Sequence, residues 1–524
     1  MAKFVTAREA AALIPDNATI GLAGMGLSGW AEEVGCAIRD HYKETGHPRN
    51  LNLKQGSAMG DWRERGATRF GEAGEGCVTR WSGAHVGSAF ALRDLAVANK
   101  IQCHCLPQGV VVNLWREIAA GRPGLITKIG LGTFVDPRLG GGKMNEVTTD
   151  ELVKLIEIDG EEYLFYKSFP LNVALLRGTT ADENGNITFE HESIINEGLA
   201  VAEAAHNSGG IVIVQVEYVT KAGTMNPKDV KIPGILVDYV VQATSKEACW
   251  QAEGVYFEPA FSGQVKKPLS QITPLPLNER KVIARRCAME LRKGDIVNLG
   301  VGMAADVANI VAEEGYSDQI VMTTESGQVG GVPSALPNFG SSYNPEATME
   351  HGAMFDLIDG GGLDVTCLGL GEADEEGNIN VSKFGPRLTG PGGFINITQM
   401  TGNVVFCGTF MGKAKMKFGD GKMEILQEGN IRKFLKKVEQ ITFAGQYSPA
   451  SQRVIYVTER CVFELINKKM TIIEIAPGVD LQKDILALMD FEPAVSPDLK
   501  LMDPAIFQET WGQLDKTILQ PRKG

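Results

Sequence analysis

The sequence contains no long apolar run and no excess of positive charge. No stretch of about 18 consecutive apolar residues occurs, so we expect no membrane-spanning helix. The formal net charge is −13, which argues against a nucleic-acid-binding surface. Residues 1–6 lead into a polar helical segment without an apolar signal core, which favours a cytoplasmic protein. We therefore expect neither a membrane nor a nucleic-acid partner.

The nine cysteines are scattered and include no Cys-x-x-Cys pair. This pattern predicts reduced thiols rather than disulfides. Cys103-His104-Cys105 has metal-ligand residue types, but neighbouring residues on a strand point to alternating faces. No second Cys/His cluster lies nearby in the sequence, so we predict no metal site.

The chain instead has many glycines and an internal repeat. It holds 61 glycines in 524 residues, above the usual share of about 7%. Residues 181–188 match residues 373–380 at six of eight positions, and each copy follows an apolar run. Residues 16–26 and 294–303 also resemble each other as a turn, an apolar strand and a glycine loop. We predict two related α/β domains with mainly parallel sheets.

Each copy of the glycine loop follows a predicted helix. Thr6 and Glu9 form a capping-box pattern that opens a helix over residues 7–14, and Asn278 can cap a helix over 279–291. Three prolines within residues 266–276 predict a stiff linker. We therefore expect an N-terminal domain over 1–274, with an insertion between about 60 and 160, and a C-terminal domain over 275–524.

Glu325 is the candidate nucleophile. It follows a β-branched run in Val-Met-Thr-Thr-Glu-Ser-Gly, where Ser-Gly ends the predicted strand. Ligands collect at strand ends in open α/β sheets, and a carboxylate there can act as a covalent nucleophile. Alternatively, Glu325 is a solvated loop residue, as most isolated glutamates are. The repeat predicts that Gln55 holds the equivalent place in the first half, which would leave only one nucleophile.

The spacing of Gly24, Gly26 and Gly29 matches the Gly-x-Gly-x-x-Gly pattern of a dinucleotide-binding motif. Lys54 and Gln55, rather than an acid, end the next predicted strand. A tight strand-to-helix turn is at least as good an interpretation, and we expect no nucleotide redox cofactor.

Five ordered motifs spread over both halves resemble the family I coenzyme A transferases, in particular the single-chain propionate/acetate CoA-transferases. They are residues 298–302, 325–333, 359–364, 380–385 and 392–397, and Pro107-Gln108-Gly109 also fits. The resemblance covers essentially the whole chain. It implies the fold of that family, with two related α/β domains, and places the catalytic glutamate in the second.

The resemblance implies a role for each candidate residue. Glu325 would attack an acyl-CoA thioester, and the released CoA would then form a thioester with Glu325 itself. Gln108 and the amide of Gly393 match positions that donate hydrogen bonds to the oxyanions. For Gln108 the alternative is a loop amide that caps backbone. The expected CoA contacts are Gly300, Val301, Gly302, Met303 and Gly392.

One loop departs from the family pattern. Ala31-Glu32 stands where close relatives show Pro-Glu, and Trp30 precedes it. If this loop lines the acyl pocket, Ser28 and Trp30 would shape it, and the preferred acid would differ from acetate or propionate.

The sequence thus predicts CoA transfer from a short-chain acyl-CoA to a short-chain carboxylic acid of the acetate/propionate type. CoA is a substrate in this scheme, and no metal is needed. The resemblance also implies a homo-oligomer, a dimer or tetramer. Two alternatives stay open: an acyl-CoA hydrolase on the same scaffold, and a non-catalytic acyl-CoA sensor.

Overall fold

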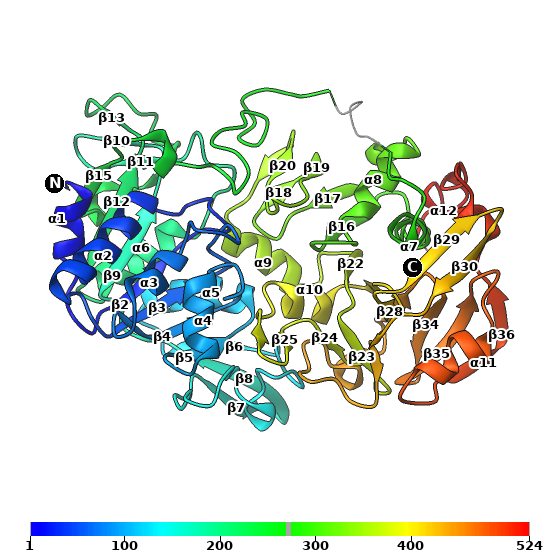
Figure 1. Ribbon diagram of the computed structural model, residues 1–524. Coiled ribbons are helices and arrows are strands. Elements are labelled where there is room, and N and C mark those ends of the chain that lie inside the picture. The colour runs from blue at the N-terminus through cyan, green and yellow to red at the C-terminus, as the bar shows by residue number, and fades with distance from the viewer. Residues whose placement is uncertain (1, 269–273, 523–524) are drawn as a thin grey trace.

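The computed structural model describes residues 2–268 and 274–522 and consists of two halves, each built on a mainly parallel sheet (Figure 1). The first half is coloured blue to green and the second green to red. The predicted boundary near residue 275 adjoins residues 269–273, and that part of the predicted linker lies outside the described residues.

The sheet of the first half has eight strands, all paired in parallel. Its central strands are nearly continuous apolar runs, as expected for strands buried on both faces. The order across the sheet is β1 (Lys3–Phe4), β15 (Tyr239–Gln242), β12 (Ile211–Val216), β9 (Val173–Arg177), β2 (Thr19–Leu22), β3 (Leu51–Gln55), β4 (Val78–Gly83) and β5 (Gln102–Cys105).

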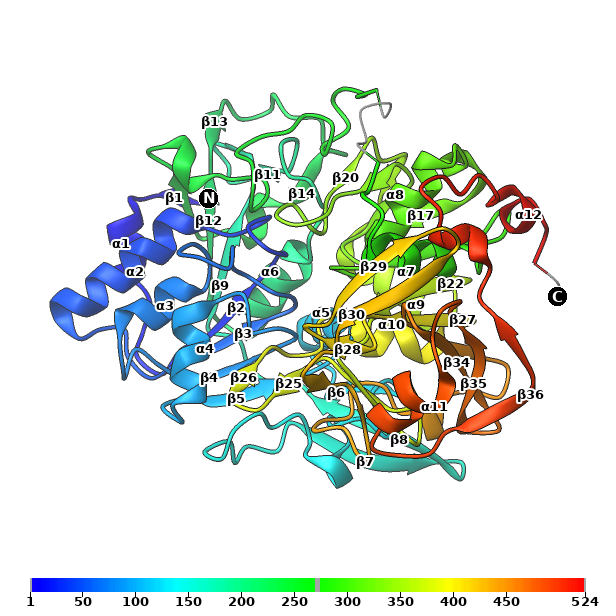
Figure 2. The same cartoon turned by 45° about the vertical axis from the view of Figure 1, so that its right-hand side comes forward.

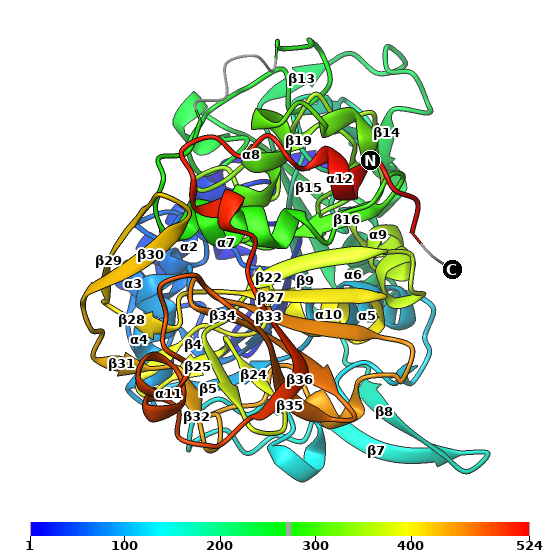
Figure 3. The ribbon, with the colours of Figure 1, turned by 90° about the vertical axis from the view of Figure 1, so that its right-hand side faces the viewer.

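The sheet of the second half has ten strands with a parallel centre from β17 to β33. In Figure 3, which faces this half, β22, β27 and β33 lie side by side. The order is β21 (Ala347–Thr348), β18 (Gln328–Val329), β17 (Val321–Thr323), β16 (Ile296–Leu299), β22 (Val365–Gly369), β27 (Asn403–Cys407), β33 (Arg453–Val457), β34 (Cys461–Ile466), β35 (Lys469–Ile475) and β36 (Ala494–Leu501).

Short strands form smaller sheets around these two. The β6–β8–β7 sheet lies at the bottom of Figure 2, and the β29–β30 hairpin runs along the second half. In chain order these strands are β6 (Gly124–Thr127), β7 (Val153–Ile158), β8 (Glu161–Lys167), β10 (Thr180–Asp182), β11 (Ile187–Thr188), β13 (Tyr218–Thr220), β14 (Val230–Ile232), β19 (Val332–Pro333), β20 (Ser342–Tyr343), β23 (Glu372–Asp374), β24 (Ile379–Asn380), β25 (Lys383–Phe384), β26 (Arg387–Leu388), β28 (Met411–Gly412), β29 (Lys415–Gly419), β30 (Lys422–Gln427), β31 (Ile431–Arg432) and β32 (Phe434–Leu435).

The helices begin where the sequence predicts but end earlier. Thr6 and Glu9 form the expected capping box before α1, and Asn278 Oδ1 accepts a hydrogen bond from Lys281 N at the start of α7. The helices are α1 (Ala7–Ala12), α2 (Glu32–Thr45), α3 (Thr68–Ala73), α4 (Phe90–Val97), α5 (Gln108–Ala119), α6 (Gly198–Asn207), α7 (Glu279–Ala288), α8 (Asp306–Glu313), α9 (His351–Asp359), α10 (Phe394–Met400), α11 (Leu481–Asp484) and α12 (Asp515–Ile518).

The repeat in the sequence is a repeat in the structure. The order β15-β12-β9-β2-β3 in the first half corresponds to β33-β27-β22-β16-β17 in the second. The matching Asp-x-x-Gly-Asn turns join β10 to β11 and β23 to β24. In each turn the carboxylate, Asp182 or Asp374, accepts backbone N–H bonds from residues two and four positions later. The fold prediction is confirmed.

The two halves pack against each other through shared helices and a shared apolar core. Helix α5 of the first half contacts α9 and α10 of the second, and all three lie near the middle of Figure 1. The buried cluster of the first half also includes Leu388 and Ile395 from the second. No helix in the described part of the chain is long and apolar enough to cross a membrane.

Candidate active site

A cavity of about 210 Å³ lies between the two halves, at the carboxyl ends of their parallel strands. Loops after β2, β3 and β4 contribute its first wall. The loops after β16 and β17, the end of β22 and residues 389–394 contribute the second. Carboxyl ends of parallel strands are where open α/β folds bind ligands. The lining is mainly apolar, with Glu325 and Gln108 among the few polar groups.

Glu325 lies in the turn that follows β17 and borders this cavity. Thr324 N donates to Gln328 O, and Gln328 N donates to the Thr324 hydroxyl, so the turn is held from both sides. Burial raises the pKa of Glu325 above the ordinary value of 4.5, while the nearby His351 and Gln108 oppose that rise. A poorly hydrated carboxylate is a stronger nucleophile than a solvated one.

Gly393 packs directly against the Glu325 carboxylate. A Cβ atom at this position would lie 2.2 Å from Glu325 Oε2, so any side chain here would displace the Glu325 carboxylate. The preceding Gly392 is fixed to the first half, because its N–H donates to Ala84 O at 3.0 Å and its carbonyl accepts from Gln108 N at 3.1 Å. Among the described residues, no acceptor takes the Gly393 N–H. That N–H is available to an oxyanion beside Glu325.

Gln108 is the first residue of α5 and is buried beside the cavity. Its Nε2 lies 3.1 Å from Nε2 of His351, and Nδ1 of His351 lies 2.8 Å from Oε2 of Glu197. With this spacing Nδ1–H can donate to Glu197, and Nε2 can accept one of the two Gln108 amide protons. The second Gln108 proton is then left for the cavity. Gln108 can therefore donate into the cavity, and its role as an oxyanion donor stays a prediction.

The glycine loop after β16 meets the cavity only at its start. Gly300 and Val301 line the cavity, and the Val301 side chain is exposed. Gly302 and Met303 lie outside the walls, and α8 begins three residues later at Asp306. Arg280 Nη2 donates to Gly302 O at 3.2 Å and brings a positive charge to this loop.

Ser28 and Trp30 do not line the cavity, which corrects the expectation that they shape an acyl pocket. The Ser28 hydroxyl donates to Gln251 O, and the buried Trp30 ring packs edge-on against Phe70. Trp30 Nε1 donates to Glu32 at 2.6 Å. The same loop instead places Met25 and Gly26 in the wall.

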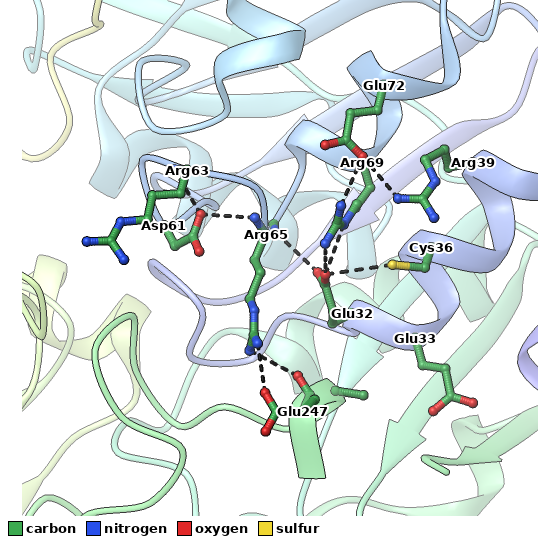
Figure 4. Close-up of polar contacts among 12 residues, drawn as sticks. Glu32, Glu33, Cys36, Arg39, Asp61, Arg63, Arg65, Arg69, Glu72 and Glu247 are labelled. Carbon is green, nitrogen blue, oxygen red and sulfur yellow. Dashed lines mark hydrogen bonds and ion pairs between the residues drawn. The ribbon is translucent and has the colours of Figure 1, made fainter. Parts of the chain in front are cut away.

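Glu32 explains why Trp30 turns away from the cavity. The Glu32 carboxylate also accepts from Arg69 at 2.7 and 2.9 Å, and Arg69 in turn pairs with Glu72 (Figure 4). Asp61, in the loop beside this network, accepts backbone N–H bonds from Arg63 and Arg65 (Figure 4). Gly66 N also donates to Glu32 Oε2 at 3.2 Å, so the network holds the end of the loop that carries the cavity residue Trp62.

The Gly24–Gly29 segment is a tight turn. Met25 N donates to Ser28 O, and Ser28 N donates to Met25 O. Gly24, Gly26 and Gly29 all have positive φ, which accounts for the three glycines without a dinucleotide.

The proposed match between Gln55 and Glu325 is wrong by two residues. Gln55 pairs with Leu22, two residues before Gly24, whereas Thr323 pairs with Asn298, two residues before Gly300. The structural counterpart of Gln55 is therefore Thr323. The counterpart of Glu325 is Ser57, which lines the same cavity. The position of the first half that corresponds to Glu325 is therefore still not a carboxylate.

The cysteine side chains are mostly packed inside the protein, and His104 contacts the backbone. All nine thiols are free, and eight are buried. His104 lies on β5 with its Nε2 2.9 Å from Asp150 O. Within the described residues, no group of three or more His, Cys, Asp or Glu side chains could hold a metal ion.

Sequence reasoning missed several residues of the site, namely Glu197, His351, Trp62, His85 and Glu253. Each is an isolated polar or aromatic residue with no local motif. Glu197 and His351 are 154 positions apart and meet only because the two halves pack together. No spacing rule links residues on different domains.

The chain matches known proteins over nearly its whole length. The family model "Coenzyme A transferase" matches residues 4–243. A caffeate CoA-transferase from Acetobacterium woodii is 69% identical, over 98% of this chain and 99% of that protein. The acetate CoA-transferase YdiF from Escherichia coli O157:H7 is 42% identical, over 96% of this chain and 94% of that protein.

Solved structures show the same architecture. The apoenzyme of the acyl-CoA transferase YdiF from Escherichia coli O157:H7 matches with a TM-score of 0.91 at 42% identity, covering 98% of this chain and 97% of that one. A second structure of that enzyme, described as a thioester complex with CoA, matches with a TM-score of 0.90 at 41% identity, with the same coverage.

Proposed function

The chain belongs to the coenzyme A transferase family, and we propose that it transfers CoA through a thioester formed on Glu325. As a CoA-transferase it moves CoA between an acyl-CoA and a carboxylate. The similar YdiF enzyme is described in a thioester complex with CoA, which supports a covalent route. CoA is a substrate here and not a resident cofactor.

Glu325 carries the covalent chemistry in this proposal. Its carboxylate adds to the thioester carbonyl, CoA leaves as a thiolate, and a mixed anhydride of the acid and Glu325 remains. The thiolate then adds to the Glu325 carbonyl, and the acid leaves as a carboxylate. A second acid reverses both steps and departs as the new acyl-CoA. The energy of the thioester is conserved at each stage, so no ATP is consumed.

Two oxyanions form along this route, and each needs donors already in place. One forms on the substrate carbonyl and the other on the carbonyl of Glu325. The Gly393 N–H next to Glu325 and the Gln108 amide at the cavity wall are the available donors. The observation that carries the proposal is therefore the close approach of Gly393 to Glu325 Oε2. Beside it lies the Gln108 amide, which is held by His351 and, through His351, by Glu197.

The lining of the cavity favours a transferred acid with a larger apolar body than acetate. Its walls include Met25, Trp62, Leu336, Phe339 and Phe394. The Acetobacterium woodii relative is named for caffeate, an aryl-substituted propenoic acid. We therefore place arylpropenoic acids first among the acceptors. Short acids of the acetate/propionate type are the second candidate, favoured by the similarity to an acetate CoA-transferase.

Initial-rate kinetics with a panel of acceptors test this proposal. Double-reciprocal plots for acyl-CoA and acceptor should give parallel lines, as expected for ping-pong transfer. The specificity constant should rise from acetate to arylpropenoic acids. Acceptor-independent release of free CoA at the full rate would support the hydrolase instead, and binding without turnover would support a sensor. A homo-oligomer, dimer or tetramer, remains a prediction that light scattering can check.

A further inference from the structure

The cavity contains polar atoms that the CoA-transfer chemistry does not use. They belong to Glu253, His85 and Ser57, all of which line the cavity. Glu253 Oε2, His85 Nδ1 and Ser57 Oγ are buried and have no hydrogen-bond partner among the described residues. A buried polar atom without a partner is costly, so three in one apolar cavity need an explanation.

These three side chains belong to one continuous wall of the first half. Gln55 Nε2 donates to Ser57 O at 2.9 Å and to His85 O at 3.4 Å, which ties those two loops together. Gly26 N donates to Ala58 O at 2.7 Å, and a Cβ on Gly26 would lie 2.6 Å from Glu253 Oε1. The loops after β2, β3 and β4 therefore share the wall with Glu253. Glu325 belongs to the opposite half.

We propose that Glu253 is a specificity-determining residue whose unpartnered carboxyl group binds a hydroxyl group carried by the body of the transferred acid. The inference rests on the proposed function, because the carboxylate of that acid must lie at Glu325. The body of the acid then extends along the apolar walls towards Glu253. Ser57 and His85 supply further partners for a second hydroxyl group.

The chemistry of Glu253 suits a hydroxyl ligand. Burial, reinforced by the nearby charge of Asp61, raises the pKa of Glu253 to about 8. Near neutral pH the side chain is therefore mainly a neutral carboxylic acid, which can both donate and accept a hydrogen bond. A hydroxyl group can do the same, so the two groups match. Burial also lowers the pKa of His85 to about 4, so that ring is neutral as well.

A buried carboxyl group that binds a substrate hydroxyl group discriminates strongly between a hydroxylated acid and its deoxy analogue. A site built to bind a substrate hydroxyl rejects the analogue that lacks it, because the buried protein groups then stay unpaired. An apolar wall alone discriminates much less between such a pair. The preference for a hydroxylated acid over its deoxy analogue is thus the quantity that Glu253 should control.

The test compares 4-hydroxyphenylpropenoic acid with phenylpropenoic acid as CoA acceptors. In the wild-type protein we expect kcat/KM to favour the hydroxylated acid. In Glu253→Met, which keeps the side-chain length, this preference should fall at least about tenfold, while the constant for the deoxy acid stays within about twofold. Glu253→Gln, whose amide can donate and accept, should keep most of the preference. The exposed Glu247→Gln on the same segment is the matched control and should leave it unchanged.

Thermal unfolding separates this role from a structural one. Because Glu253 has an unpartnered buried oxygen, Glu253→Met without substrate should have a Tm equal to or above that of the wild type. A lower Tm, or an unchanged hydroxyl preference in Glu253→Met, would overturn the role of Glu253. Failure of the proposed substrate class has a different signature, because the wild type would then transfer CoA to neither aromatic acid while still using acetate.

Discussion

Nδ1 of His351 lies 2.8 Å from Oε2 of Glu197, and both side chains are completely buried at the junction of the two halves. Glu197 immediately precedes α6 of the first half, and His351 is the first residue of α9 in the second. The other ring nitrogen of His351 meets Gln108, so the pair orients the amide next to Glu325. The contact thus couples domain packing to the geometry of the oxyanion donor.

Replacement of His351 should therefore slow catalysis without weakening CoA binding. In His351→Ala the Gln108 amide loses its orienting partner, and we expect kcat to fall about 100-fold, as is typical for a misplaced catalytic group. The KM for acyl-CoA should change little. Steady-state kinetics with both substrates provide the measurement, with the exposed His206→Ala on α6 as the control. An unchanged kcat would show that Gln108 needs no such support.

Gln108 itself should contribute more than its orienting partner. Gln108→Ala removes a donor that faces the developing oxyanion, and we expect kcat to fall by about 100- to 1,000-fold. Single-turnover formation of the Glu325 adduct should slow by a similar factor. A loss confined to KM would instead mean that Gln108 only binds the ground state.

Gly393 should tolerate no side chain. In Gly393→Ala the new methyl group would lie 2.2 Å from Glu325 Oε2, so the carboxylate must move, and activity should be lost nearly completely. Gly402→Ala is the matched control, because its Cβ would meet its nearest atom, Asp364 O, at an ordinary 3.5 Å. Acyl-CoA turnover and Tm should both be measured. Near-normal turnover in Gly393→Ala would exclude the close approach.

Asp359 should make stability depend on pH. It is held behind the site by Asn396, which donates to both of its carboxylate oxygens and to which Gly109 N also donates. Burial raises the pKa of Asp359 from 3.8 to about 7. The folded protein then keeps a proton that the unfolded chain has released, so this residue lowers the free energy of unfolding as pH rises from about 4 to about 7.

The Asp359→Asn variant tests that dependence. Its Tm should fall less steeply than that of the wild type between about pH 5 and pH 7, and the two slopes should converge at higher pH. Parallel Tm profiles across this range would contradict the assignment to Asp359.

Local sequence patterns were sufficient for much of this fold. The repeated Asp-x-x-Gly-Asn turns and glycine loops predicted two related α/β halves, because turn chemistry and strand periodicity are local properties. Helices α1 and α7 end at Ala12 and Ala288, before their apolar patterns end. For α1 a local signal was overlooked, because Pro15 disfavours helical backbone at Ile14.

The side chains of the site were harder to predict because their neighbours come from distant segments. Trp30 looked like a pocket residue from its place in a glycine loop, but its ring packs against Phe70, which lies on α3 in a distant part of the sequence. The sequence repeat aligned Gln55 with Glu325, but the strand register aligns Ser57 with Glu325 instead. In both cases a contact between distant residues, not the local motif, decides the role.

Intact-mass spectrometry tests the central claim most directly. The protein is incubated with an acyl-CoA and no acceptor, and peptide mapping then locates any modification. We predict a mass increase of one CoA less one water, confined to the peptide that contains Glu325 and absent from Glu325→Gln. Full transfer activity without that adduct on Glu325 would contradict the covalent mechanism.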